Sequence, residues 1–266
     1  MLRKFLGKSH RNTASAPQDA RIYAIGDIHG CLTELDALLG LIKNDAKSDL
    51  NESVEGDGAA KSSNAANSTT NATLVFLGDY IDRGPASKEV IDRLIDLQNS
   101  DWQTVFLKGN HEAAMLNFMA APRKHSEWLH WGGAETLESY GIEHVWSRDE
   151  DDLAANLASV MPQSHRDFLE TLELMHQEAD YIFVHAGLKP GIALEEQEEQ
   201  DLLWIRSEFH NTAPGDRLEY TVIHGHHPVK KPQDRGWRVN VDTGACWSGM
   251  LSAVVLEKNK RRFLST

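Results

Sequence analysis

The feature that most constrains this chain is a junction that occurs three times in its first half. At each junction a short apolar run ends in a glycine, and an acidic or amide residue follows: GDIHG at 26–30, GDYIDRG at 78–84 and GNHE at 109–112. Apolar residues at helical spacing come next along the chain. Strands that alternate with helices build an α/β fold, and ligands collect at the carboxyl ends of its strands. We therefore expect an α/β protein with its polar site at these junctions.

The second half of the chain is richer in strands. Two more apolar runs end in comparable polar turns, VHAG at 184–187 and HGHHP at 224–228. The pattern predicts strands at 21–25, 73–79, 104–110, 181–187, 219–226, 237–244 and 252–258, and helices at 32–42, 87–98, 111–119 and 162–174. Short connections between the later strands indicate that the sheets are mixed.

Two segments lack the pattern of a packed core. Residues 1–20 are polar and aperiodic, which predicts a flexible N-terminal tail. Residues 44–72 are dominated by small and polar side chains, which predicts a low-complexity insertion in a surface connection. Because the segment 21–42 is too short to fold alone, we expect a single domain over 21–260 rather than a boundary at the insertion.

Composition excludes several classes of protein. The 266 residues include 40 Asp and Glu against 27 Lys and Arg, a net charge of −13, which argues against a partner that is a nucleic-acid polymer. Cys31 and Cys246 are too few for a disulfide framework. Every apolar run is too short to cross a membrane. We expect a cytoplasmic protein without a membrane partner; the oligomeric state stays open, and a monomer is plausible.

The side chains at the junctions have the chemistry of metal ligands. The five predicted strand ends supply Asp27, His29, Asp79, Asp82, Arg83, Asn110, His111, His185 and the histidines of 224–227. Carboxylate, imidazole and amide donors without a thiolate suit Mn, Fe, Zn or Mg. There are more donors than one ion needs, and a carboxylate such as Asp79 can bridge two. Two ions about 3.5–4 Å apart lower the pKa of a shared water and clamp a phosphoryl group.

Each of these residues also has a purely structural interpretation. Asp27 and Asp79 could cap helices, and His185 could be a hydrogen-bonded core histidine. Arg83 and Arg206 could form ordinary ion pairs. The gathering of several ligand types at neighbouring strand ends favours the functional interpretation.

Taken in order, the five motifs resemble the signature set of the phosphoprotein phosphatase family, within the calcineurin-like metallophosphoesterase superfamily. The resemblance is strongest to the bacterial branch, which the segments 128–141, 202–209 and 239–245 also fit. It implies an α/β sandwich of two mixed β-sheets flanked by helices. His227 departs from the family, whose members often carry a small hydroxyl residue there, so substrate or metal preference could differ.

The resemblance also implies a role for each site residue. The ligands of the first metal would be Asp27, His29 and the bridging Asp79. The ligands of the second would be Asp79, Asn110, His185 and, from the Gly-His-x-Pro pattern, His226 rather than His224. His111 would protonate the leaving group, oriented by Asp82. The substrate phosphate would be bound by Arg83, Arg206 and Asn110.

The expected activity is that of a dinuclear-metal phosphomonoesterase acting on a phosphoprotein or a small phosphoester. Foremost is a serine/threonine-type protein phosphatase in which a metal-activated water attacks phosphorus directly. The cofactors would be two divalent ions, manganese first, with iron, zinc or magnesium as alternatives. The same motifs fit a symmetrical dinucleoside-tetraphosphate hydrolase or another nucleotide phosphoesterase. A non-catalytic, metal-binding regulatory scaffold is the alternative of a different class.

Overall fold

The structure is a computed structural model that describes residues 14–18, 20–52, 72–212 and 220–266. These residues form two five-stranded sheets, of strand order β10-β9-β1-β2-β3 and β4-β5-β6-β8-β7. The strands of the first sheet are β1 (Arg21–Ile25), β2 (Ala72–Phe76), β3 (Gln103–Phe106), β9 (Ser252–Glu257) and β10 (Lys260–Ser265). Those of the second are β4 (Met175–Glu178), β5 (Tyr181–Val184), β6 (Thr221–His224), β7 (Gln233–Asp234) and β8 (Arg238–Asn240).

Each sheet is mixed and contains three neighbouring parallel strands. In the first sheet β1 pairs in parallel with β2, and β2 with β3, while β9 and β10 are antiparallel. In the second sheet β5, β6 and β8 are parallel, and the edge strands β4 and β7 are antiparallel. The parallel strands place their carboxyl ends on one side of each sheet, where the glycine junctions follow. The expected α/β sandwich of two mixed sheets is confirmed.

The core has layers because the central strands are buried on both faces. In β1, Ile22 and Ala24 face the second sheet, where they meet Phe183 of β5 and Ile223 of β6. The alternate residues of β1 pack instead in the cluster formed with the helices. A third cluster on the outer face of the second sheet includes Phe209. The strand RIYAI therefore packs its apolar side chains into a core on each face of the sheet.

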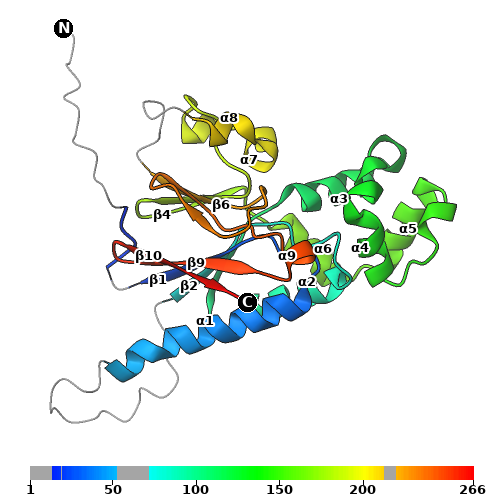
Figure 1. Ribbon diagram of the computed structural model, residues 1–266. Helices are drawn as coiled ribbons and strands as arrows, with labels where there is room; N and C mark the ends of the chain where they lie inside the picture. The colour runs from blue at the N-terminus through cyan, green and yellow to red at the C-terminus, as the bar shows by residue number, and fades with distance from the viewer. Residues whose placement is uncertain (1–13, 19, 53–71, 213–219) are drawn as a thin grey trace, which may run out of the picture.

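Helices cover the sandwich on its outer sides and at one end (Figure 1). The longest is α1 (Leu32–Glu52), on the side of the first sheet; α7 (Glu199–Trp204) and α8 (Ser207–His210) lie on the side of the second. The others are α2 (Ser87–Gln98), α3 (Asn110–Ala120), α4 (Ala134–Ser139), α5 (Glu150–Val160), α6 (Gln163–Glu170) and α9 (Ala245–Ser248), with short helical turns η1 (Pro122–Lys124), η2 (Leu129–Gly133), η3 (Val145–Ser147) and η4 (Leu194–Glu196). Over the described residues, no helix has the length and apolar character needed to cross a membrane.

Two of the expected irregular segments differ from the prediction. Helix α1 continues to Glu52, so the first part of the segment 44–72 is helical; Ala46 is buried there and extends the apolar face of the helix. Residues 53–71 lie outside the described residues. The predicted tail is fixed at Ala16, which is buried and donates its backbone N–H to Lys258. The predicted strand 21–25 is confirmed with the same bounds, the other predicted strands exist but are shorter, and β4, β7 and β10 were not predicted.

Candidate metal centre

The junction turns have an unusual backbone. His29, Asp79, Asp82, Arg83 and His226 all have positive φ, between 51° and 73°. Residues with a Cβ seldom adopt this left-handed conformation, and such strain of about 1–3 kcal/mol persists mainly at functional sites. These turns reverse the chain directly after a strand and direct the side chains toward one another.

Glycines beside these residues leave room for the carboxylates. A Cβ at Gly109 would lie 2.1 Å from Oδ1 of Asp79, and a Cβ at Gly225 would lie 2.0 Å from Oδ1 of Asp27. Neither carboxylate could stay in place if the glycine carried a side chain. The glycine of each motif is therefore part of the construction of the site.

Two groups of buried donors meet at the carboxylate of Asp79. On one side, Nε2 of His29 lies 3.5 Å and Nε2 of His111 lies 3.9 Å from Oδ2 of Asp79. On the other side, Nε2 of His185 lies 3.4 Å from Oδ1, and Nδ1 of His226 lies 3.2 Å from Nε2 of His185. Each group has three ligand atoms within 4.8 Å of one another, and Asp79 belongs to both. This is the arrangement that a bridging carboxylate between two cations requires.

The imidazoles are held in the form that binds a cation. Nδ1 of His29 donates to the carbonyl of Ile81 and Nδ1 of His185 to that of Leu77, so each Nε2 keeps its lone pair for the site. Burial lowers the pKa of His29 to about 3 and that of His226 to about 2, which keeps both rings neutral. Nε2 of His226 is buried and has no hydrogen-bond partner among the described residues. These observations fit a bound metal.

Asp27 and Asn110 join the site less directly. The carboxylate of Asp27 accepts the backbone N–H of His226, at 3.1 and 3.2 Å, and belongs to neither ligand group. Burial, with the charges of Asp242 and Asp79, raises its pKa well above the ordinary value. Oδ1 of Asn110 lies 2.9 Å from Nε2 of His185, in the second group. The structure therefore places His111, rather than Asp27, in the first ligand group.

His111 and Asp82 form a buried pair beside the first group. Nδ1 of His111 lies 2.6 Å from Oδ2 of Asp82. Burial alone would lower the pKa of His111, but the nearby charge of Asp79 and the hydrogen bond to Asp82 raise it above the ordinary value. His111 is thus suited to carry a proton at Nε2, next to Asp79. The pairing matches the role that the family resemblance implies for these two residues.

Three supporting residues were not predicted as part of the site. Nε1 of Trp128 donates to Asp82 at 2.8 Å, and Oγ1 of Thr136 donates to its other oxygen at 2.6 Å. Both lie in the segment 128–141, which carried the family likeness and could have indicated them. Glu112 is fully buried and accepts backbone N–H groups of Asp79, Tyr80 and Gly109, so it joins two junctions.

The two predicted phosphate-binding arginines behave differently. The guanidinium of Arg83 lies within hydrogen-bond distance of Nε2 of both His29 and His111, and 4.9 Å from the ring centroid of Trp247. It is therefore already directed at the first ligand group. Arg206 is exposed, between α7 and α8, and lines a pocket beside the second group. His224 is buried and contacts Arg238, away from both groups.

This geometry has a counterpart among known proteins. A model of the calcineurin-like phosphoesterase family matches residues 20–256. The chain belongs to that family. Calcineurin-like phosphoesterases are hydrolases, and this chain is accordingly a metal-dependent phosphoric ester hydrolase.

Relatives of the chain have related activities. It is 25% identical over 247 residues to the asymmetrical bis(5'-nucleosyl)-tetraphosphatase PrpE of Oceanobacillus iheyensis, covering 88% of this chain and 87% of that one. The enzyme of the same name from Anoxybacillus flavithermus is 24% identical over 252 residues, covering 86% and 88%. Among solved structures, a cold-active protein-tyrosine phosphatase of a psychrophilic Shewanella species matches with a TM-score of 0.61 at 14% identity, covering 97% and 85%. That last likeness shows the fold alone.

Proposed function

We propose that this chain hydrolyses dinucleoside tetraphosphates, cleaving them asymmetrically, with two divalent cations bound at Asp79. The observation that carries the catalytic part is the pair of buried donor groups on opposite oxygens of that carboxylate. His29 would hold one cation and His185, His226 and Asn110 the other, with Asp27 contributing to the first. When bound, such ions would supply a nucleophilic water and neutralise charge on the phosphoryl oxygens.

The chain's own residues would complete the reaction. Protonated His111, oriented by Asp82, would donate its Nε2 proton to the oxygen of the leaving phosphate. Arg83 would turn from the imidazoles to the non-bridging phosphate oxygens, with which its fork can make two hydrogen bonds. Trp128 and Thr136 would keep Asp82 in its orientation while the proton moves.

The substrate assignment follows the relatives rather than the motifs. The sequence favoured a protein phosphatase and placed a symmetrical tetraphosphate hydrolase second. The curated relatives carry the name of a dinucleoside tetraphosphatase, and the name specifies the asymmetrical reaction. The matches cover 88% and 86% of this chain. Asymmetrical cleavage of diadenosine tetraphosphate gives AMP and ATP, whereas symmetrical cleavage gives two molecules of ADP.

Product analysis tests this proposal. The protein reconstituted with manganese should convert diadenosine tetraphosphate to AMP and ATP in preference to hydrolysing a phosphoserine peptide. Asp79→Asn should lose both activities, whereas Asp96→Asn, which removes an exposed carboxylate on α2, should keep them. Formation of ADP alone would overturn the asymmetrical assignment. A clear preference for the phosphopeptide would restore the protein phosphatase interpretation.

A further inference from the structure

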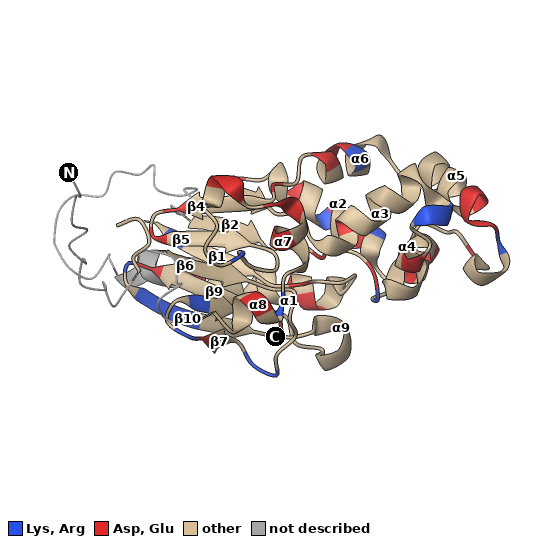
Figure 2. Ribbon diagram, turned by 90° about the horizontal axis from the view of Figure 1, so that it is seen from above, with Lys and Arg blue, Asp and Glu red and all other residues tan. Residues whose placement is uncertain are grey.

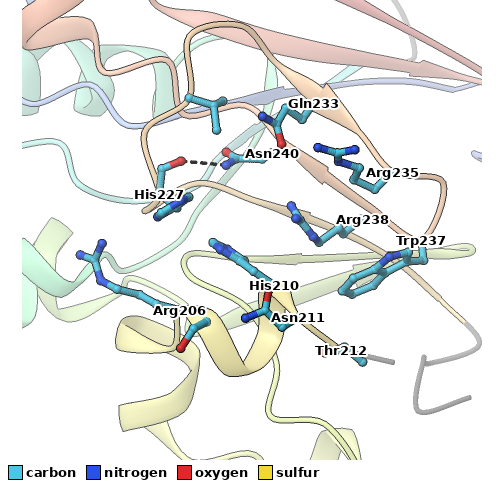
Figure 3. A pocket seen from close by; sticks show the side chains of 12 residues that line it. Arg206, His210, Asn211, Thr212, His227, Gln233, Arg235, Trp237, Arg238 and Asn240 are labelled. Carbon is cyan, nitrogen blue, oxygen red and sulfur yellow. Dashed lines mark hydrogen bonds between the residues drawn. The ribbon is translucent and has the colours of Figure 1, made fainter. Parts of the chain in front are cut away.

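A pocket of about 720 Å³ opens beside the second ligand group (Figure 3). It is walled by α8 and the residue before it, by the turn after β6, and by the β7–β8 hairpin. Its lining includes Arg206, His210, His227, Arg235, Trp237 and Arg238. We call it the arginine pocket.

The arginine pocket is strongly basic within an acidic protein. Three arginines and two histidines line it, and none of its described lining residues is acidic, although the whole chain has a net charge of −13. Lys and Arg positions also lie on β10, outside the pocket (Figure 2), where Arg261 donates to Asp234. A concave surface with charge of one sign concentrates ligands of the opposite sign.

Arg238 shows that this charge is built into the fold. Its side chain leaves strand β8 and the residue is only 8% exposed, yet no carboxylate pairs with it among the described residues. One guanidinium nitrogen contacts Nε2 of His224 at 3.3 Å, and Nε has no partner among the residues described. Burial and the nearby positive charge of Arg235 lower its pKa. A buried cation without a counter-ion is costly, which indicates that an anion completes the site.

The neighbouring side chains have the same incomplete pairing. Nε2 of His210 is buried without a hydrogen-bond partner among the described residues. The side chain of Arg235 is exposed and has no ion-pair partner in the described part of the chain. Figure 3 shows Arg206 and His227 at one end of the pocket, Arg235 and Trp237 at the other, and Arg238 between them.

The position of the pocket connects it to the metal centre. His227 follows His226, which belongs to the second ligand group, directly in the chain. The ring centroid of Trp204, two residues before Arg206 in the chain, lies 6.2 Å from that of His226, so the Arg206 segment also adjoins the second ligand group. A ligand bound at the metals could therefore extend past Arg206 and His227 toward Arg238 and Arg235.

We propose that the arginine pocket binds the triphosphate arm of a dinucleoside tetraphosphate, on the far side of the bond that is cleaved. This inference rests on the proposed function. Successive phosphates offer pairs of oxygens that guanidinium forks match, and they would supply the anion that Arg238 lacks. A phosphopeptide would bring a single phosphate to the metals. It would supply no further phosphate to fill a second, wholly basic pocket. An arm of three phosphates on one side is what asymmetrical cleavage requires.

Kinetic selectivity tests the role of the pocket. Arg235→Ala is the main variant, because this exposed side chain can be removed without disturbing the core; Arg238→Lys keeps the charge but removes the fork. We expect Arg235→Ala to lower the ratio of kcat/KM for diadenosine tetraphosphate to that for p-nitrophenyl phosphate by about tenfold or more. Arg148→Ala, outside the pocket, should leave that ratio within about twofold.

A second measurement separates the pocket from the proposed substrate. Inorganic tripolyphosphate, with metal in excess, should inhibit p-nitrophenyl phosphate hydrolysis, and its Ki should rise about tenfold in Arg235→Ala and in Arg238→Lys. If that rise in Ki occurs but diadenosine tetraphosphate is not hydrolysed, the arginine pocket binds a polyphosphate and the proposed function is wrong. If diadenosine tetraphosphate is cleaved to AMP and ATP while selectivity and Ki stay unchanged in both variants, the proposed function holds and the pocket inference is wrong.

Discussion

At the scale of single residues, the position of His111 fits two roles, metal ligand and general acid. Its Nε2 lies 3.9 Å from Asp79 and close to His29, so it could bind a cation. Its Nδ1 pairs with Asp82, which raises the pKa of the ring and favours a protonated form that cannot bind a cation. Burial instead lowers the pKa of His29 and of His226, so these two rings are neutral and free to bind a cation. On this contrast we propose that His111 transfers a proton.

Replacing His111 distinguishes the two uses. His111→Asn should lower kcat by about 10²–10⁴, the usual contribution of a general acid, while metal content stays close to two ions per chain. His176→Asn, on the edge strand β4, serves as the matched control and should change neither value. Metal analysis by mass spectrometry alongside steady-state kinetics gives the answer. Loss of one equivalent of metal would instead make His111 a ligand.

At the scale of elements, the C-terminal half of α1 is attached to the first sheet by a charged cluster at Asp45. Asp45 of α1 accepts hydrogen bonds from Tyr23 of β1 at 2.7 Å, from Arg21 at 3.2 Å and from Arg262 of β10. Partial burial opposes ionisation, but the bonds from Arg262 and Tyr23 outweigh it and lower the pKa of Asp45. This cluster explains why helix α1 continues into a segment whose composition predicts a loop.

Stability should therefore depend on the charge of Asp45 in a defined pH range. The pKa of Asp45 is lower in the folded than in the unfolded chain. The contribution of its carboxylate to the free energy of unfolding is therefore complete above about pH 4 and is lost as the pH falls through the pKa of the folded state. Asp45→Asn should cost about 1 kcal/mol at pH 7, and the difference from wild type should shrink toward pH 3. The control is Asp36→Asn. Asp36 lies on α1 like Asp45, and its substitution removes a more exposed ion pair with Arg93 of α2. Urea unfolding at several pH values measures both; a loss that does not change with pH would contradict this account.

At the scale of the whole molecule, the sequence predicted the junctions and their meeting at the strand ends, and it missed contacts from segments that carry no such junction. Every ligand junction is a run of adjacent residues, so GDIHG or GNHE indicates its own geometry. Trp128 and Thr136 reach Asp82 from 46 and 54 residues away, and no periodicity carries that contact. The arginine pocket combines three segments between 206 and 240 that show no common motif. The short edge strands β4 and β7 are stabilised by pairing with a neighbour rather than by their own composition.

We also expect bound metal to stabilise the whole molecule, because the carboxylates of the site are buried. Asp27, Asp79 and Asp242 are buried in the interior. Burial first, and the charge of Asp79 in addition, raises the pKa of Asp27 and of Asp242, the latter to about 6. Cations bound between them would relieve that repulsion only in the folded chain. A ligand at a hundred times its Kd stabilises a protein by about 2.7 kcal/mol, so chelation should lower Tm by several degrees, and manganese should restore it. Asp79→Asn should respond to neither, because it lacks the bridging carboxylate. An equal fall in the Tm of wild type and variant would show that the chelator acts elsewhere.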